Sequence, residues 1–194
     1  MSPPSESPRP EIASESSEYT ASERTLLLGL AHRSIAAVIE QHDVDLTPPT
    51  QHLAEYRGAF TTLHLHGRLR GCIGYVLPTQ PLYQTVAETA KAAAFDDPRF
   101  YPVTIAEAAA LKIEISILSA LRPVAAENVV VGKHGLVVTQ GSRRGLLLPQ
   151  VPIKWEWDRD TFLTQTCLKA GLDPDAWRQG AELQAFTAEV FGEE

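Results

Sequence analysis

Cys72 is the residue of this sequence whose neighbours most favour covalent chemistry. It lies in the string Leu69-Arg-Gly-Cys-Ile-Gly74, whose pattern predicts a strand. On a strand, Arg70 and Cys72 share one face with Gly74, and a guanidinium two residues away favours the thiolate over the thiol. Gly71 and Gly74 leave room beside the sulfur for a ligand or a second backbone. Cys72 is therefore a candidate nucleophile; the alternative is a buried cysteine that packs as a small apolar side chain.

Two residues on the polar face of a strand predicted over residues 111–117 could assist such a nucleophile. Glu114 is a candidate general base, or a carboxylate that holds an arginine such as Arg70. Ser116, on the same face, is a candidate substrate contact. The alternative is a solvated sheet face, which Lys112 beside them favours.

The histidines suggest acid–base chemistry more than metal binding. His134 precedes Gly135 in a loop before a predicted strand, and paired with Cys72 it would form a thiol–imidazole nucleophile. The alternative is a turn histidine with no chemical role. His64 and His66 alternate on a strand, but the predicted turn begins at His66 and no third ligand can be placed. The sequence therefore predicts no metal site.

A loop and a strand end supply the remaining candidates. Arg99 could bind a substrate anion through its guanidinium, or Asp97 could pair with Arg99 while Phe100 anchors the loop. Gln150 could orient a ligand or satisfy loop backbone. The candidate catalytic residues are Cys72, Arg70, Glu114 and His134. The candidate substrate-binding residues are Gly71, Gly74, Asp97, Arg99, Ser116 and Gln150.

The predicted elements alternate between hairpins and helices, and the order is typical of an α+β fold with mainly antiparallel sheet and flanking helices. Each hairpin is followed by a helix and a strand, which indicates an internal structural duplication. The elements are a helix from Thr20 to Gln41, a hairpin over 59–65 and 69–75, a helix over 81–95, a strand over 111–117, a hairpin over 135–140 and 145–149, a helix after Asp158 or Asp160, and a strand over 181–191.

The first predicted hairpin has a register that its faces determine. A three-residue loop, or its bulged equivalent, pairs Leu63 with Gly71 and Thr62 with Cys72. A two-residue loop would place Leu63 opposite Arg70 and mix the apolar and polar faces of the sheet. The sequence therefore predicts that Thr62 lies beside the sulfur.

Composition restricts the class of protein. The chain has 194 residues and a net charge of −7, which argues against an electrostatic grip on nucleic acid or on an anionic membrane. No apolar run approaches the roughly 20 residues of a membrane span, and two cysteines cannot form a four-thiolate metal site. Residues 1–21 are rich in Ser, Pro and Glu and are predicted to be a disordered tail before a domain over 22–194. We expect a cytoplasmic protein.

Several strings together resemble the AMMECR-one domain family. The hallmark of that family is the string Leu69–Gly74. The supporting strings are Asp97-Pro-Arg-Phe100, Glu114-Ile-Ser116, Lys133-His-Gly-Leu136, Leu148-Pro-Gln-Val151 and Lys169-Ala-Gly-Leu172. The resemblance runs from about residue 22 to residue 192, in order and at the spacing of the family.

The resemblance implies duplicated β-α-β-β units that form a larger and a smaller lobe with a cleft between them. It also implies Memo-like and radical S-adenosylmethionine proteins as partners, and modification of a nucleic-acid base or another small molecule. It implies no cofactor of the chain itself and assigns no reaction. Two hypotheses follow. One is a cleft enzyme, or the substrate-handling subunit of one, that uses Cys72. The alternative is a non-catalytic binding or scaffold module for a protein or RNA partner.

Overall fold

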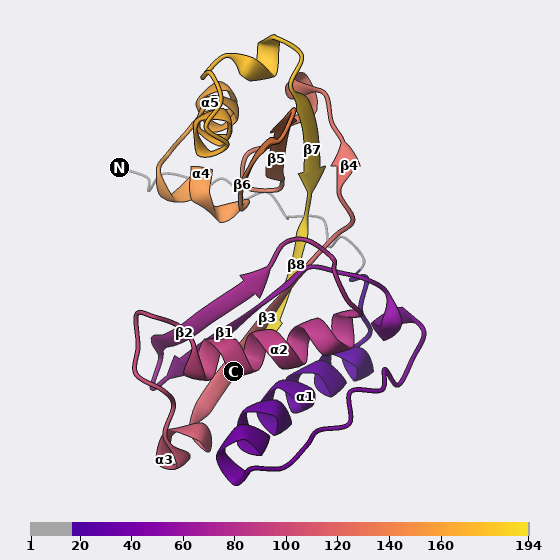
Figure 1. Ribbon diagram of the computed structural model, residues 1–194, viewed down its shortest axis with the longest axis vertical. Coiled ribbons are helices and arrows are strands. Elements are labelled where there is room, and N and C mark those ends of the chain that lie inside the picture. The colour runs from indigo at the N-terminus through magenta and orange to yellow at the C-terminus, as the bar shows by residue number, and fades with distance from the viewer. Residues whose placement is uncertain (1–16, 194) are drawn as a thin grey trace, which may run out of the picture.

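Two four-stranded antiparallel sheets form the framework of the protein, as the α+β prediction requires. A computed structural model of the chain describes residues 17–193. The first sheet has the order β2-β1-β3-β8, with β1 (Ala59–Leu65), β2 (Arg68–Tyr75), β3 (Leu111–Leu118) and β8 (Ala188–Gly192). The second has the order β4-β7-β5-β6, with β4 (Arg122–Pro123), β5 (Gly135–Gln140), β6 (Arg143–Leu147) and β7 (Glu182–Phe186). Figure 1 shows the two sheets in separate lobes.

The two sheets repeat one order of connections and exchange their last strands. In each lobe a hairpin leads into a helix, and the next strand returns beside the first strand of the hairpin. The fourth strand then crosses to the other sheet: β4 follows β3 but pairs with β7, and β8 follows β7 but pairs with β3 (Figure 1). Each half of the chain thus has the order strand, strand, helix, strand, strand, and its last four elements follow the β-α-β-β order that the resemblance implied. The two short crossings hold the lobes against each other.

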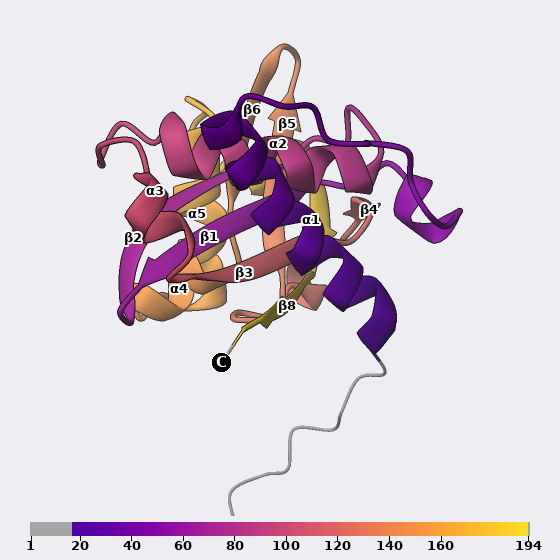
Figure 2. The same ribbon diagram turned by 90° about the horizontal axis from the view of Figure 1, so that it is seen from below.

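Helices cover only one face of the first sheet. These are α1 (Ala21–Glu40) and α2 (Leu82–Phe95), with the short α3 (Ile105–Ala108) beside them (Figure 2). Alternate strand residues such as Leu63, Ile113 and Ile115 are buried beneath the helices. The intervening residues of the same strands face the other lobe, and this face carries Cys72 and Glu114. None of the described helices is both long and apolar enough to cross a bilayer.

The helix predicted from Thr20 starts there through a capping box, in which Thr20 and Glu23 bond each other's backbone N–H groups. Of the predicted tail, residues 1–16 lie outside the described residues. Tyr19, within the remainder of that tail, is 1% exposed and packs in the core of the first lobe. The packed part of the chain therefore includes residues before 22.

The helix α5 (Arg159–Lys169), which Asp158 caps, covers the second sheet. The short helix α4 (Gln150–Lys154) follows β6 along the chain. Phe162 and Cys167 of α5 are fully buried against the sheet. A separate apolar cluster joins the two lobes. Its buried members are Leu118, Val137 and Phe186, and the partly buried residues against it include Phe60, Leu146 and Leu148.

One glycine in each lobe lets a helix approach the hairpin at backbone distance. A Cβ at Gly71 of β2 would lie 2.0 Å from the Ala93 carbonyl oxygen of α2. A Cβ at Gly145 of β6 would lie 2.4 Å from the backbone nitrogen of Ala170, at the end of α5. Both contacts are with backbone, so no side chain can move to relieve them. Gly71 therefore packs against a helix and does not face the other lobe.

A β-bulge redirects Arg70. The predicted pairs Leu63–Gly71 and Thr62–Cys72 are present, but the register then shifts so that His64 pairs with Leu69. Arg70 is the extra residue of this bulged hairpin, and such a residue leaves the alternation of its strand. The prediction that Arg70 shares a face with Cys72 is therefore wrong.

The redirected guanidinium binds α3. Its Nε and Nη2 atoms donate to the two carboxylate oxygens of Glu107 at 3.0 and 3.1 Å, and Phe100 lies 6.0 Å from it. The Arg70 hydrogen bonds, and after them the bond from the Thr104 backbone, lower the pKa of Glu107 from its ordinary 4.5 to about 2. This ion pair anchors α3 to the hairpin.

We predict that Gly71→Ala and Gly145→Ala each destabilise the protein by about 2–3 kcal/mol, because the new methyl group must displace helix backbone. The matched control is Gly29→Ala within α1, where the added Cβ meets only the mobile end of Arg33. That change should stabilise the protein by up to about 1 kcal/mol. Chemical denaturation of the three variants measures the effect. Equal effects at all three glycines would contradict the packing argument.

The Arg70–Glu107 ion pair should make stability depend on acid. Because the folded state lowers the pKa of Glu107 from 4.5 to about 2, the ion pair makes its full contribution to the free energy of unfolding above pH 4.5. That contribution is lost as the pH falls from 4.5 to about 2. We expect wild type to be more stable than Glu107→Gln by about 1 kcal/mol near pH 6, allowing for partial exposure, and by progressively less toward pH 3. Gln preserves the capping box at Thr104. A difference that stays constant with pH would contradict this assignment.

Candidate functional site

A pocket of about 310 Å³ lies over the helix-free face of the first sheet, where the second lobe approaches it. All four strands of that sheet contribute to its floor, and the segment at the end of β6 and the start of α4 supplies the opposite side. The lining residues are Phe60, Thr62, Cys72, Glu114, Ser116, Leu118, Leu148, Gln150, Ala188 and Val190. Four of the residues proposed from sequence therefore converge here: Cys72, Glu114, Ser116 and Gln150.

Cys72, Thr62 and Glu114 form one row across three neighbouring strands. Cys72 pairs with Thr62, and Thr62 pairs in turn with Glu114. The Thr62 hydroxyl donates to the Cys72 sulfur at 3.3 Å. Adjacent strands are about 4.8 Å apart, so the backbones of the two outer residues are separated by about 10 Å. A thiol and a carboxyl group thus stand on either side of a hydroxyl group.

The Glu114 carboxylate is available for a ligand. Its side chain is half-buried in the pocket wall. Among residues 17–193 no hydrogen bond or ion pair reaches it. Arg70, the arginine that it was expected to hold, is bound to Glu107 instead. A carboxyl group in this position can accept or deliver a proton.

The backbone of Cys72 is held by a clamp on the outer edge of β2. This strand is the edge of its sheet, so its outward N–H and C=O groups have no neighbouring strand. Asp97 accepts the Cys72 N–H at 2.9 Å, and Arg99 donates to the Cys72 carbonyl at 3.3 Å. Asp97 is 4% exposed. The hydrogen bond from Arg99, and then those from the Cys72 and Arg99 backbones, hold its pKa far below its ordinary range. The clamp fixes the direction in which the sulfur points.

Asp97 and Arg99 pair with each other, as the structural alternative had it, and neither lines the pocket. Arg99, and not Arg70, is the arginine that contacts Cys72, through the Cys72 backbone carbonyl. The pKa of Arg99 is raised chiefly by its hydrogen bond to Asp97.

Three other candidates lie away from the pocket: His134, Gly71 and Gly74. His134 borders a second hollow of about 510 Å³ between the lobes, together with Arg57 and Arg122. Its Nδ1 accepts the Val130 N–H at 3.1 Å. The Cys72 pocket does not include it, so the structure brings no thiol–imidazole pair together there. Gly71 faces α2, and Gly74 lies under the ring of Phe60, which occupies the position of a Cβ.

Thr62 was not among the candidate residues, although the predicted register already placed it opposite Cys72. Phe60 and Val190 were also missed. Phe60 could have been found from Gly74, since a glycine opposite an aromatic residue on a neighbouring strand is a common packing arrangement. Nothing in the sequence indicates that Val190 of β8 crosses back into the first sheet.

Known proteins resemble this chain in sequence and in fold. Protein MK0488 of Methanopyrus kandleri is 42% identical over 189 residues, covering 91% of each chain. Protein TK0174 of Thermococcus kodakarensis is 42% identical over 183 residues, covering 87% of this chain and 89% of the relative. The crystal structure of the uncharacterized protein PH0010 from Pyrococcus horikoshii matches with a TM-score of 0.68 and 39% identity, covering 87% of this chain and 90% of that chain.

The family match confirms the resemblance drawn from the sequence strings. Residues 28–191, which include both sheets except the last residue of β8, match the AMMECR1 family. The relatives cover nearly the whole of this chain at about 40% identity. This chain belongs to the AMMECR1 family.

Proposed function

We propose that the pocket between the lobes binds a small polar molecule and that Cys72 attacks it as a nucleophile. The observation that carries this proposal is the row in which Cys72, Thr62 and Glu114 lie side by side on the pocket floor. A substrate lying over Thr62 would have a sulfur on one side and a carboxyl group on the other. This is the arrangement that nucleophilic attack with proton transfer requires.

Two polar side chains hold Cys72 in place. The Thr62 hydroxyl donates to its sulfur, and the Arg99 guanidinium donates to its backbone carbonyl. The clamp from Asp97 keeps the backbone in place while the side chain reacts. Attack by the thiolate on an electrophilic carbon forms a C–S bond as the bond to the leaving group breaks. The leaving group keeps the electron pair and takes a proton from Glu114, and water activated by the same carboxylate then cleaves the C–S bond.

The pocket size limits the substrate. A volume of about 310 Å³ is at the lower end for ligand pockets, which suits a small metabolite or a single nucleobase. The exposed Gln150 and the half-buried Ser116 offer hydrogen bonds that could orient such a group. A base presented by a partner protein would be consistent with the partners that the family resemblance implies.

We predict that iodoacetamide modifies Cys72 of the folded protein much faster than Cys167. Cys167 is an internal control, because burial in the core of the second lobe raises its thiol pKa. Replacing Thr62 with Val removes the donor to the sulfur without changing side-chain shape, so the Cys72 rate at pH 7 should fall about three- to tenfold. Peptide mass spectrometry after timed quenching gives both rates.

The nucleophile proposal fails if Cys72 reacts only when the protein unfolds, or if both cysteines react at the same rate. A thermal melt of the Thr62→Val variant separates loss of reactivity from loss of structure. In either of those outcomes the binding or scaffold alternative becomes the better account.

A further inference from the structure

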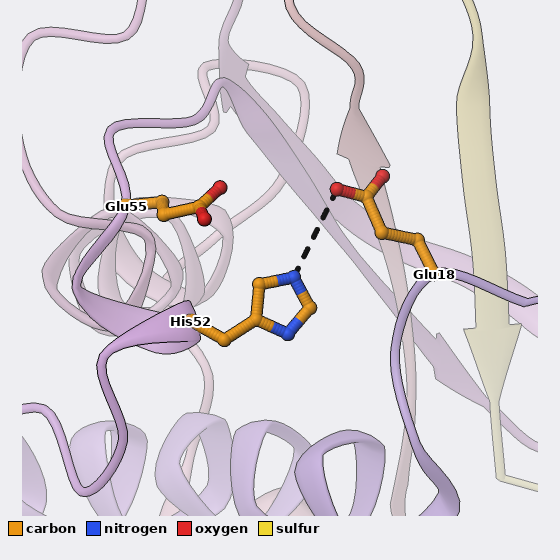
Figure 3. Close-up of side chains that lie close together, drawn as sticks. All are labelled: Glu18, His52 and Glu55. Carbon is orange, nitrogen blue, oxygen red and sulfur yellow. Dashed lines mark ion pairs between the residues drawn. The ribbon is translucent and has the colours of Figure 1, made fainter.

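A second group of chemically active side chains lies outside the Cys72 pocket, where the N-terminal segment meets the loop after α1. Glu18, His52 and Glu55 each direct one possible ligand atom toward a common point, and these atoms all lie within 4.8 Å of one another. Figure 3 shows the three side chains converging, with His52 between the two carboxylates. His52 begins the 3-10 helix His52–Ala54, and Glu55 follows it. Glu18 also borders the 510 Å³ hollow.

His52 is oriented as a metal ligand would be. Its Nδ1 lies 2.9 Å from a carboxylate oxygen of Glu23, which is 9% exposed and can only accept a hydrogen bond when ionised. Nδ1 therefore donates to Glu23, and Nε2 is left as the ligand atom. Nε2 lies 3.8 Å from Oε1 of Glu18 (Figure 3). This separation is too long for a hydrogen bond but suits two atoms that both bind one metal ion at about 2.0–2.2 Å.

The charges of the cluster leave room for a divalent cation. The carboxylates of Glu18, Glu23 and Glu55 contribute three negative charges, and Arg57 contributes one positive charge. With a neutral imidazole the sum is about −2. The guanidinium of Arg57 contacts Oε1 of Glu18 and Oε2 of Glu55. Oε1 of Glu18 is also the oxygen nearest His52 Nε2, and a carboxylate oxygen that accepts one hydrogen bond keeps a second lone pair for a metal.

Tyr19 supplies an independent observation. Its ring stacks on the His52 ring, with the centroids 4.5 Å apart and the planes 3° from parallel. Its hydroxyl is buried, with no hydrogen-bond partner among the described residues. Its chain neighbour Glu18 and the stacked His52 are both members of the cluster. A buried hydroxyl without a partner therefore lies beside the same cluster, where a metal-bound water or anion could satisfy it.

We propose that Glu18, His52 and Glu55 bind a divalent transition-metal ion, and specifically Zn²⁺. Imidazole nitrogen and carboxylate oxygen are both donors that Zn²⁺ binds, and three protein ligands keep a fourth position for water or substrate. Glu23 holds the histidine from behind, as carboxylates commonly do at zinc sites. The Glu18 and Glu55 side chains are 42% and 48% exposed and can rotate to close the set around the ion. The fourth position would open toward the 510 Å³ hollow that Glu18 borders.

Zinc binding to untagged protein tests this assignment by isothermal titration calorimetry. The Cys72→Ser background removes the half-buried thiol as a competing ligand. We expect one Zn²⁺ per chain with a Kd of about 10 μM or tighter, and at least 30-fold weaker binding in His52→Gln. Glu23→Gln preserves the capping box at the start of α1, and it should weaken binding about tenfold through the lost support of His52. Mg²⁺ should not compete, since it disfavours imidazole nitrogen.

His42→Gln is the matched control, because His42 also lies against a carboxylate, that of Glu40 at 3.1 Å, but is exposed and outside the cluster. It should bind Zn²⁺ as the background does. Glu55→Gln changes an exposed side chain, and so it serves as the ligand variant if His52→Gln does not fold. Binding that is unaffected by both His52→Gln and Glu55→Gln would overturn the proposal. So would a background protein that binds no Zn²⁺ below about 100 μM, which would make His52 an imidazolium in an ion-pair network.

Discussion

The close contact between β2 and α2 at Gly71 is the constraint on which the candidate site depends. The Ala93 carbonyl lies where a Cβ of residue 71 would be, so helix and strand touch through their backbones. This contact fixes the end of α2 beside the edge of the sheet. The chain that leaves the helix reaches that edge within two residues, and Asp97 binds the Cys72 N–H there. The position of the sulfur therefore follows from a packing contact on the opposite face of the same strand.

The second lobe repeats the packing without the chemistry. Gly145 meets the end of α5 as Gly71 meets α2, so Leu146 occupies the position that corresponds to Cys72. Leu146 packs in the apolar cluster between the lobes. One lobe thus uses this position to join the two halves, whereas the other leaves a thiol in the pocket beside that junction. The exchange of β4 and β8 between the sheets connects the two lobes beside the pocket, and β8 also lines it.

The sequence predicted the local parts of this arrangement and missed those that depend on tertiary contacts. Alternation placed Thr62 opposite Cys72 and Glu114 on the polar face, because strand period and hairpin register are local properties. The bulge that turns Arg70 toward Glu107 interrupts that period and has no clear signal in the string itself. Cys72 and Gln150 meet only because the lobes pack together, which a hydrophobic pattern cannot encode.

The same limit applies to the histidines. His134 was a candidate partner for Cys72 because a thiol and an imidazole can together form a nucleophile, but it precedes β5, an inner strand of the other sheet, and borders a different hollow. His52 was not among the candidate residues, because its partners Glu18 and Glu23 lie about 30 residues away along the chain. A stacked tyrosine and a capping glutamate give it a defined orientation that only the folded chain reveals.

The proposed chemistry requires that the Cys72 sulfur opens into the pocket shared with Glu114 and Gln150. A crystal structure of the protein after reaction with iodoacetamide would show where the sulfur points. We expect a carboxamidomethyl group on the sulfur that lies over Thr62, with its amide within hydrogen-bond distance of Glu114 or Gln150. An adduct that points along the outer edge of β2 toward Arg99, or that forms only with displacement of the Asp97 clamp, would contradict it.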